Sequence, residues 1–152
     1  MELNGETLRF IREHCKDDVR SLALQAPKYP GVDMPVALTQ IAGRQAAAEK
    51  IPSWHEEEGV LYPRHLSLEQ CSSEATARYK ASIIPGSSSG TLTDLTGGFG
   101  IDCAFLSPRF HHVTYVERQE VLCEIASHNF PLLGLNHIRI ENKDGIRHLQ
   151  EM

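Results

Sequence analysis

The stretch that decides the fold reads Thr91-Leu92-Thr93-Asp94-Leu95-Thr96-Gly97-Gly98-Phe99-Gly100-Ile101-Asp102. Alternating polar and apolar residues over 91–95 are typical of a strand, and the apolar residues from Ile101 to Leu106 open a helix. The glycines between them allow a tight turn with positive φ and let a ligand approach the backbone. Such a loop directs N–H groups and the positive end of a helix dipole at a carboxylate or phosphate. The stretch therefore predicts a loop that binds a nucleotide cofactor.

The spacing of the glycines limits which cofactor this loop can bind. A dinucleotide-binding loop reads G-x-G-x-x-G/A, whereas Gly98-Phe99-Gly100 is followed by Ile101, Asp102 and Cys103. Because the third glycine is missing, NAD binding is disfavoured and a dehydrogenase is a distant alternative. A glycine turn without any ligand also stays open, since short glycine motifs occur in many loops.

An acidic residue on the strand followed by Gly-x-Gly resembles motif I of the class I S-adenosyl-L-methionine (SAM)-dependent methyltransferases. More closely, Asp94-x-Thr96-x-Gly98-x-Gly100-x-Asp102 resembles the D-x-T-x-G-x-G-x-D loop of the ribosomal RNA guanine exocyclic-amine methyltransferases. The resemblance implies SAM as the cofactor and RNA as a methyl acceptor. Thr96 stands where many of these enzymes have their first glycine, which implies a different approach to the methionine end of the cofactor.

The next predicted strand supplies a second candidate. The run Val113-Thr114-Tyr115-Val116 is rich in strand-forming residues and ends in Glu117, roughly 20 residues beyond the glycine turn. At the tip of a strand, this carboxylate can accept hydrogen bonds from both hydroxyls of a ribose. The alternative is a solvated glutamate paired with Arg118, which the preceding glycine loop makes less favourable.

A third short strand is predicted from Ile138, before a polar turn and a helix that begins near Asp144. In the resembled methyltransferases an acidic or amide residue of this turn contacts the adenine, and Asp144 matches that position. With a helix over 119–133 closed by Gly134, the order β-α-β-α-β predicts an α/β fold with a Rossmann-like parallel sheet and right-handed crossovers.

The residues before the glycine loop are predicted to be helical. Apolar residues recur at three- and four-residue steps over 3–26, which predicts one amphipathic helix ended by Pro27. A second helix is expected from Pro35 to about Lys50, and a serine at 72 or 73 can cap a third. The predicted organisation is a helical lobe over 1–84, a linker over 85–90 and a partial SAM-binding domain over 91–152.

Two motifs of this helical part resemble a bacterial family of SAM methyltransferases that carry a THUMP-like domain at the C-terminus. They read Gln40-Ile41-x-Gly43-Arg44 and Glu69-Gln70-x-Ser72-Ser73-Glu74-x-Thr76-Ala77-x-Tyr79-Lys80, and the resemblance covers residues 35 to 145. In related enzymes the segment before motif I folds over the cofactor, which implies a wall made by Gln70, Ser72 and Ser73, with a plain helix cap as the alternative. The candidate cofactor-binding residues are Gln70, Ser72, Ser73, Asp94, Thr96, Gly97, Gly98, Phe99, Gly100, Asp102, Glu117, Arg118, Asp144 and Gly145.

Composition limits the remaining possibilities. The 152 residues are 41% hydrophobic, which suits one globular domain or two small lobes, and the net charge of −5 means that RNA contact needs a local basic patch. The N-terminal residues do not read as a signal peptide, so a cytoplasmic protein is expected.

The cysteines at 15, 71, 103 and 123 show no C-x-x-C pairing and are expected to be reduced and buried. The run from His55 to Glu58 is not expected to hold a metal, because adjacent residues cannot all face one ion.

The sequence after Asp144 departs from the resembled family. There the acceptor-reading motif, commonly D/N-P-P-x, follows a fourth strand, and no such motif occurs here, so the catalytic residues remain unknown. Two hypotheses follow: the SAM-binding portion of a methyltransferase whose catalytic half and THUMP-like domain lie elsewhere, or a non-catalytic binding or assembly module with the same fold. The first strand is expected to expose an edge, so the chain is expected to self-associate or to pair with a missing C-terminal half. It is also expected to transfer no methyl group alone.

Overall fold

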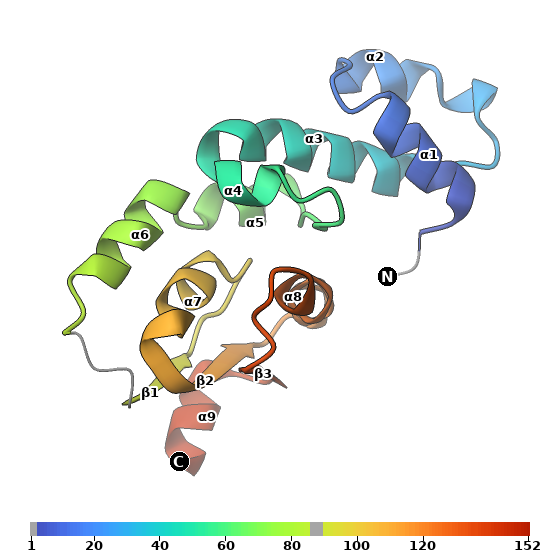
Figure 1. Ribbon diagram of the computed structural model, residues 1–152. Helices are drawn as coiled ribbons and strands as arrows, with labels where there is room; N and C mark the ends of the chain where they lie inside the picture. The colour runs from blue at the N-terminus through green and yellow to red at the C-terminus, as the bar shows by residue number, and fades with distance from the viewer. Residues whose placement is uncertain (1–2, 86–89) are drawn as a thin grey trace.

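The computed structural model of the protein describes residues 3–85 and 90–152, so most of the predicted linker, 86–89, lies outside the described residues. A helical N-terminal part is followed by a parallel sheet with helices on both faces (Figure 1). In chain order the elements are α1 (Gly5–Glu13), α2 (Val19–Leu24), η1 (Ala26–Lys28), α3 (Met34–Lys50), α4 (Pro52–His55), α5 (His65–Gln70), α6 (Glu74–Ser82), β1 (Gly90–Asp94), α7 (Ile101–Leu106), η2 (Ser107–Arg109), β2 (Phe110–Glu117), α8 (Glu120–Leu132), β3 (Ile138–Asn142) and α9 (Gly145–Glu151).

The strands described lie in the order β1-β2-β3, and both pairings are parallel. Asp94 lies opposite Tyr115, and Glu117 lies opposite Asn142, so the carboxyl ends of the strands meet at one edge of the sheet. Helices α7 and α8 cover one face and α9 lies on the other (Figure 1). The predicted α/β fold, a parallel sheet preceded by a helical part, is confirmed.

Polar side chains set the beginnings of two predicted helices. Ser73 accepts a hydrogen bond from the Thr76 N–H at 3.1 Å, and α6 starts at the next residue. Asp144 accepts from the Arg147 N–H at 3.1 Å and starts α9 in the same way. Each cap satisfies one N–H group that the first helical turn leaves without a partner.

The prediction of one helix over residues 3–26 is wrong, because the chain breaks between α1 and α2. Asp18 accepts hydrogen bonds from the Ser21 N–H at 3.1 Å and the Ser21 hydroxyl at 2.9 Å, which caps a new helix. Phe10 of α1 and Leu22 of α2 are buried in the same cluster. The apolar pattern continues across the break since both short helices pack on α3.

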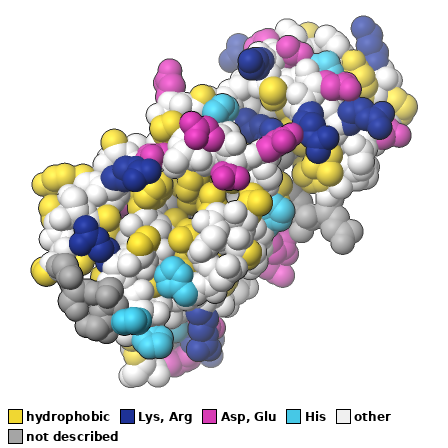
Figure 2. Space-filling model, viewed as in Figure 1, with side chains coloured by type: hydrophobic (Ala, Val, Ile, Leu, Met, Phe, Trp, Pro, Cys, Tyr) yellow, Lys and Arg dark blue, Asp and Glu magenta, His cyan; other side chains and the backbone are white. Residues whose placement is uncertain are grey.

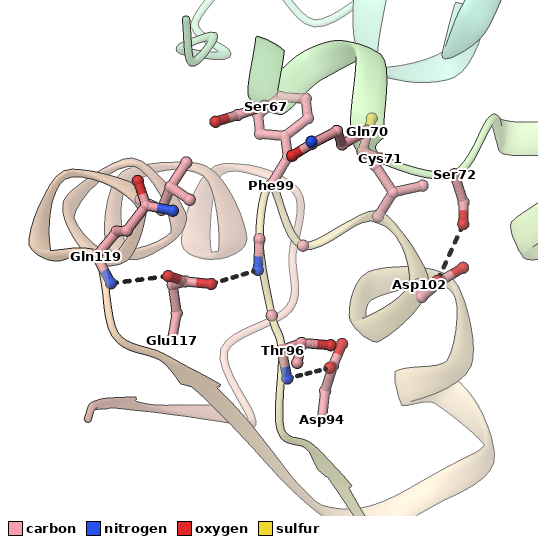
Figure 3. A pocket seen from close by; sticks show the side chains of 15 residues that line it. Ser67, Gln70, Cys71, Ser72, Asp94, Thr96, Phe99, Asp102, Glu117 and Gln119 are labelled. Carbon is pink, nitrogen blue, oxygen red and sulfur yellow. Dashed lines mark hydrogen bonds between the residues drawn. The ribbon is translucent and has the colours of Figure 1, made fainter. Parts of the chain in front are cut away.

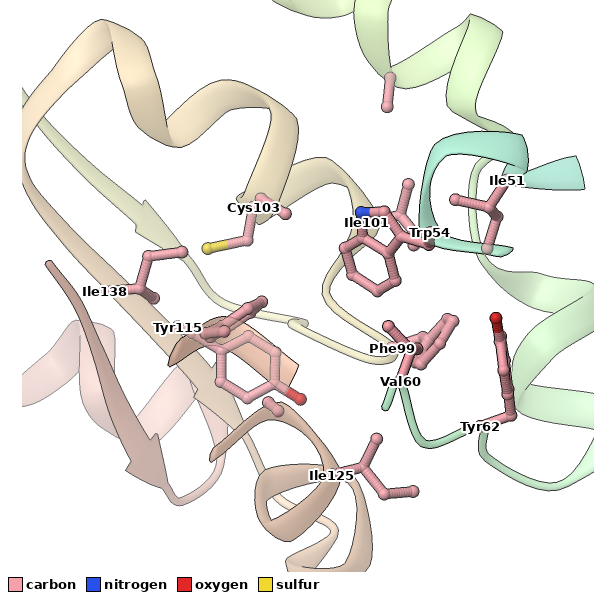
Figure 4. Close-up of a cluster of buried hydrophobic side chains, with 14 of the residues drawn as sticks. Ile51, Trp54, Val60, Tyr62, Phe99, Ile101, Cys103, Tyr115, Ile125 and Ile138 are labelled. Atoms are coloured by element: carbon pink, nitrogen blue, oxygen red, sulfur yellow. The ribbon is translucent and has the colours of Figure 1, made fainter. Parts of the chain in front are cut away.

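Two buried clusters hold the fold together. The smaller joins α1 and α2 to α3 through Phe10, Ile11, Leu22, Met34, Ala37 and Ile41. The larger runs from the helical part into the sheet (Figure 4), and Phe99 of the glycine loop lies within it. The Phe99 ring centroid is 5.2 Å from that of Trp54 and 5.9 Å from that of Tyr62. The proposed boundary at 85–90 therefore separates two segments of the chain that share one core.

Candidate cofactor cleft

A cleft of about 330 Å³ opens at the carboxyl ends of the strands (Figure 3). One side comes from the glycine loop and the ends of β1 and β2, and the other from the end of α5 and the residues after it. The lining residues are Ser67, Gln70, Cys71, Ser72, Asp94, Thr96, Gly97, Gly98, Phe99, Gly100, Ile101, Asp102, Glu117, Gln119 and Leu122.

Two glycines of the loop adopt positive φ, and they face different surroundings. Gly98 has φ 56°, and a Cβ added there would have only the Thr96 carbonyl oxygen within 4 Å, at 3.8 Å. Gly100 has φ 92°, and a Cβ there would lie 2.8 Å from Cζ of Phe130. Gly98 therefore keeps space open beside the cleft, whereas Gly100 lets the loop pack on the core.

Glu117 lies at the end of β2 and fixes the glycine loop. Its Oε1 accepts a hydrogen bond from the Gly98 N–H at 3.1 Å, and its Oε2 accepts from the Gln119 N–H at 2.7 Å. The side chain is 7% exposed, and in the described part of the chain it forms no ion pair with Arg118. Because a carboxylate oxygen can accept more than one hydrogen bond, both oxygens keep capacity for a ligand hydroxyl.

Asp94 is the carboxylate at the end of β1. Its Oδ1 accepts a hydrogen bond from the Thr96 N–H at 3.1 Å. Burial raises the pKa of the Asp94 carboxyl, and the carboxylates of Asp102 and Glu117 raise it further, against the lowering effects of the Thr96 N–H and the Lys80 ammonium. The negative charge of this end of the cleft is therefore only partly compensated.

Asp102, in the first turn of α7, connects the glycine loop to the opposite wall. Its Oδ2 accepts a hydrogen bond from the Ser72 hydroxyl at 3.0 Å and one from the Lys80 ammonium at 2.9 Å. Lys80 also donates to the Ser72 oxygen at 3.2 Å. These contacts attach the segment between α5 and α6 to the loop.

The balance of charge in the cleft is negative. Three carboxylates line it, and none of the described lining residues is a lysine or an arginine. Such a site stabilises a positively charged ligand and disfavours a diphosphate. Asp102 sits in the first turn of α7, which is where the pyrophosphate of a dinucleotide would bind.

The structure brings most of the predicted site residues together in this cleft, including Gln70 and Ser72 of the predicted wall. Four others lie outside it. Ser73 caps α6, and Asp144 caps α9. Arg118 is exposed, and its carbonyl oxygen accepts from Asn142 Nδ2 at 3.1 Å. Gly145 packs so closely on Leu95 that an added Cβ would lie 2.2 Å from the Leu95 carbonyl oxygen.

Sequence reasoning missed several lining residues, namely Ser67, Cys71, Ile101, Gln119 and Leu122. Cys71 lies between two predicted wall residues, and Gln119 follows Glu117 by two positions, so proximity in sequence was a usable signal for both. Ser67 comes from α5 and Leu122 from α8, and only the tertiary arrangement of the chain brings both residues to the cleft.

All four cysteines are free thiols. Cys103 and Cys123 are buried as predicted, whereas Cys15 and Cys71 are partly exposed. Burial raises the pKa of the Cys103 thiol to about 12, so it is protonated at neutral pH.

The residues that the structure describes hold no group of three or more His, Cys, Asp or Glu side chains suited to a metal ion. Within the same ranges, no helix combines the length and the apolar character needed to cross a bilayer.

The sheet, the glycine loop and the cleft at its edge define an α/β fold of the methyltransferase type, preceded by a helical part. Among solved structures, the chain is similar to the crystal structure of a "putative methyltransferase" from Porphyromonas gingivalis W83, with a TM-score of 0.75 and 27% sequence identity. The match covers 95% of this chain and 36% of that chain, so these residues span little more than a third of the matched protein. No protein-family model and no curated protein sequence matches the chain.

Proposed function

We propose that the chain is the SAM-binding portion of a SAM-dependent methyltransferase. The observation that carries this proposal is the set of three carboxylates around the glycine loop, without a lysine or arginine among the described lining residues. SAM carries a sulfonium cation and an amino-acid end, whereas NAD carries a negatively charged pyrophosphate. The charge of the cleft therefore favours the sulfonium cofactor over the dinucleotide.

The residues of the cleft fit the parts of such a cofactor. Glu117 would accept hydrogen bonds from the ribose hydroxyls, and Gly98 would let the cofactor lie against the backbone of the loop. Asp94, whose pKa burial raises, would be stabilised as a carboxylate by the nearby cation. When bound, SAM supplies an electrophilic methyl group that a nucleophilic acceptor can take.

RNA is the acceptor that we propose, on the resemblance of the loop from Asp94 to Asp102 to that of the ribosomal RNA guanine methyltransferases. The charge of the whole chain, −5, gives this proposal no support. On the face shown in Figure 2, the Lys and Arg side chains over the end formed by α1 and α2 are interspersed with Asp and Glu. Contact with RNA would therefore need a local patch of basic side chains.

Isothermal titration calorimetry with SAM and NAD⁺ tests the cofactor assignment. We expect saturable binding of SAM and no measurable binding of NAD⁺ at the same concentrations. Binding of NAD⁺ alone would overturn the assignment in favour of a dinucleotide site. Binding of neither would favour the non-catalytic module, with a glycine turn that serves the fold only.

A further inference from the structure

An ion pair at one end of the cleft joins the last residue of the glycine-loop motif to the helical part. Lys80 of α6 and Asp102 of α7 lie 2.9 Å apart, from Nζ to Oδ2, and the Ser72 hydroxyl contacts both. Their side chains are 45% and 33% exposed, so the pair is not sealed in the core. Ser72 and Asp102 both line the cleft, and Lys80, which is not itself a lining residue, contacts both of them.

The carboxylate of this pair has an unused oxygen. Asp102 Oδ2 accepts from two donors, but Oδ1 is shielded from solvent and has no hydrogen-bond partner among residues 3–85 and 90–152. An unpaired buried acceptor costs free energy, and a donor supplied by a ligand would remove that cost. An ammonium group is the donor that a carboxylate binds most strongly.

The pair lies where the far end of the proposed cofactor would reach. Glu117, proposed for the ribose, and Asp102 lie on opposite sides of the glycine loop (Figure 3). A ligand with its ribose at Glu117 would thus extend its other end toward Asp102 and Lys80. In SAM that end is an amino acid, which carries an ammonium and a carboxylate on one carbon atom.

We propose that Lys80 and Asp102 form the subsite for the amino-acid end of the cofactor, with Asp102 accepting from its ammonium and Lys80 donating to its carboxylate. This inference rests on the proposed function. It adds Lys80 of the helical part, which is not among the predicted cofactor-binding residues, as a specificity-determining residue. Ser72 holds the ammonium of Lys80 at the wall of the cleft.

Two ligands that differ only at this end test the subsite. S-adenosylhomocysteine and 5′-methylthioadenosine share the adenine, the ribose and an uncharged thioether, but only the first carries the amino acid. We expect Lys80→Met to weaken binding of S-adenosylhomocysteine by about tenfold to a hundredfold, the effect of losing a charged hydrogen bond. Binding of 5′-methylthioadenosine should change less than about twofold, which also shows that the variant is folded.

Matched variants complete the experiment. Asp102→Asn should show the same discrimination between the two ligands, and Lys80→Arg should restore part of the affinity. Lys16→Met, at an exposed lysine between α1 and α2, should change neither affinity. An equal loss for both ligands with Lys80→Met, or no loss for either, would overturn the subsite and leave the proposed function standing. If the wild-type chain binds neither ligand, both proposals fail.

Discussion

The position of Asp94 suits a cationic ligand, but the Asp94 carboxylate destabilises the fold when no ligand is bound. Burial and two neighbouring carboxylates raise its pKa, so the folded protein holds the Asp94 proton more tightly than the unfolded chain does. As pH rises from the ordinary pKa of Asp to the raised value, the unfolded chain loses its proton first and the stability of the fold decreases. Above that window the full cost of the buried charge remains.

Asp94→Asn should therefore stabilise the ligand-free protein at about pH 7. It should have no effect at about pH 3, where the Asp94 carboxyl is protonated in both the folded and the unfolded state. The amide oxygen of Asn can still accept from the Thr96 N–H, so the turn is preserved. Thermal melts of the two proteins at both pH values measure this. A variant that melts below the wild type at neutral pH would mean that the fold stabilises Asp94 as a carboxylate.

Glu117→Ala should weaken SAM binding by about 1.5–3 kcal/mol, or roughly ten- to a hundredfold, because the ribose would lose its acceptor. The change also leaves the N–H groups of Gly98 and Gln119 without their partner. Glu120→Ala, at an exposed residue in the first turn of α8, is the matched control and should bind SAM normally. Titration calorimetry measures the affinity of the wild type and the two variants for SAM. Equal affinities of Glu117→Ala and the wild type would remove Glu117 from the site.

Gly98→Val should abolish SAM binding, because the side chain would occupy the open space beside the cleft. Positive φ also imposes strain of roughly 1–3 kcal/mol on a β-branched residue. Gly134→Val separates the two effects, since Gly134 has φ 77° and no atom within 4 Å of an added Cβ, and it does not line the cleft. Gly134→Val should be destabilised similarly but bind SAM. Unchanged binding by Gly98→Val would contradict the assignment of the loop.

At the scale of elements, the glycine loop depends on the helical part for its position. Phe99 is 2% exposed and packs on Trp54 of α4, so the loop and the helix share buried surface. Phe99→Ala should reduce the free energy of unfolding by about 3–5 kcal/mol, the usual cost of emptying a buried aromatic site. Phe110→Ala, at a partly buried residue, should cost less. Urea denaturation compares them; equal small losses would show that Phe99 does not anchor the loop.

The elements near the glycine loop were predictable because each has a local signal. The strand, the glycine turn and the helix from Ile101 to Leu106 follow one another with no intervening loop, and Ser73 and Asp144 mark helix starts. The break after α1 was not predictable from apolar spacing, because α1 and α2 both pack on α3. Lys80 was not predictable as a neighbour of Asp102, since their contact depends on how α6 packs on α7.

For the whole molecule, β1 lies at the edge of the sheet, and no other strand of the described residues covers its free side. An unpaired strand edge can pair with another chain. We predict that the protein self-associates as its concentration rises, which light scattering over a dilution series measures. Thr91→Lys, a charge at the exposed position of β1, should reduce association, while Ser127→Lys on α8 should not. A dilution-resistant monomer would contradict this prediction.

The central claim, that SAM binds at the glycine loop, is tested most directly by NMR. The amide signals of Gly97, Gly98 and Gly100 should shift on addition of SAM, together with that of Gln119, whose N–H contacts Glu117. The signal of Gly134, outside the cleft, should stay in place. Shifts that saturate with SAM and are confined to the cleft are the result that we predict. Saturating SAM without any change at these glycines would contradict the account.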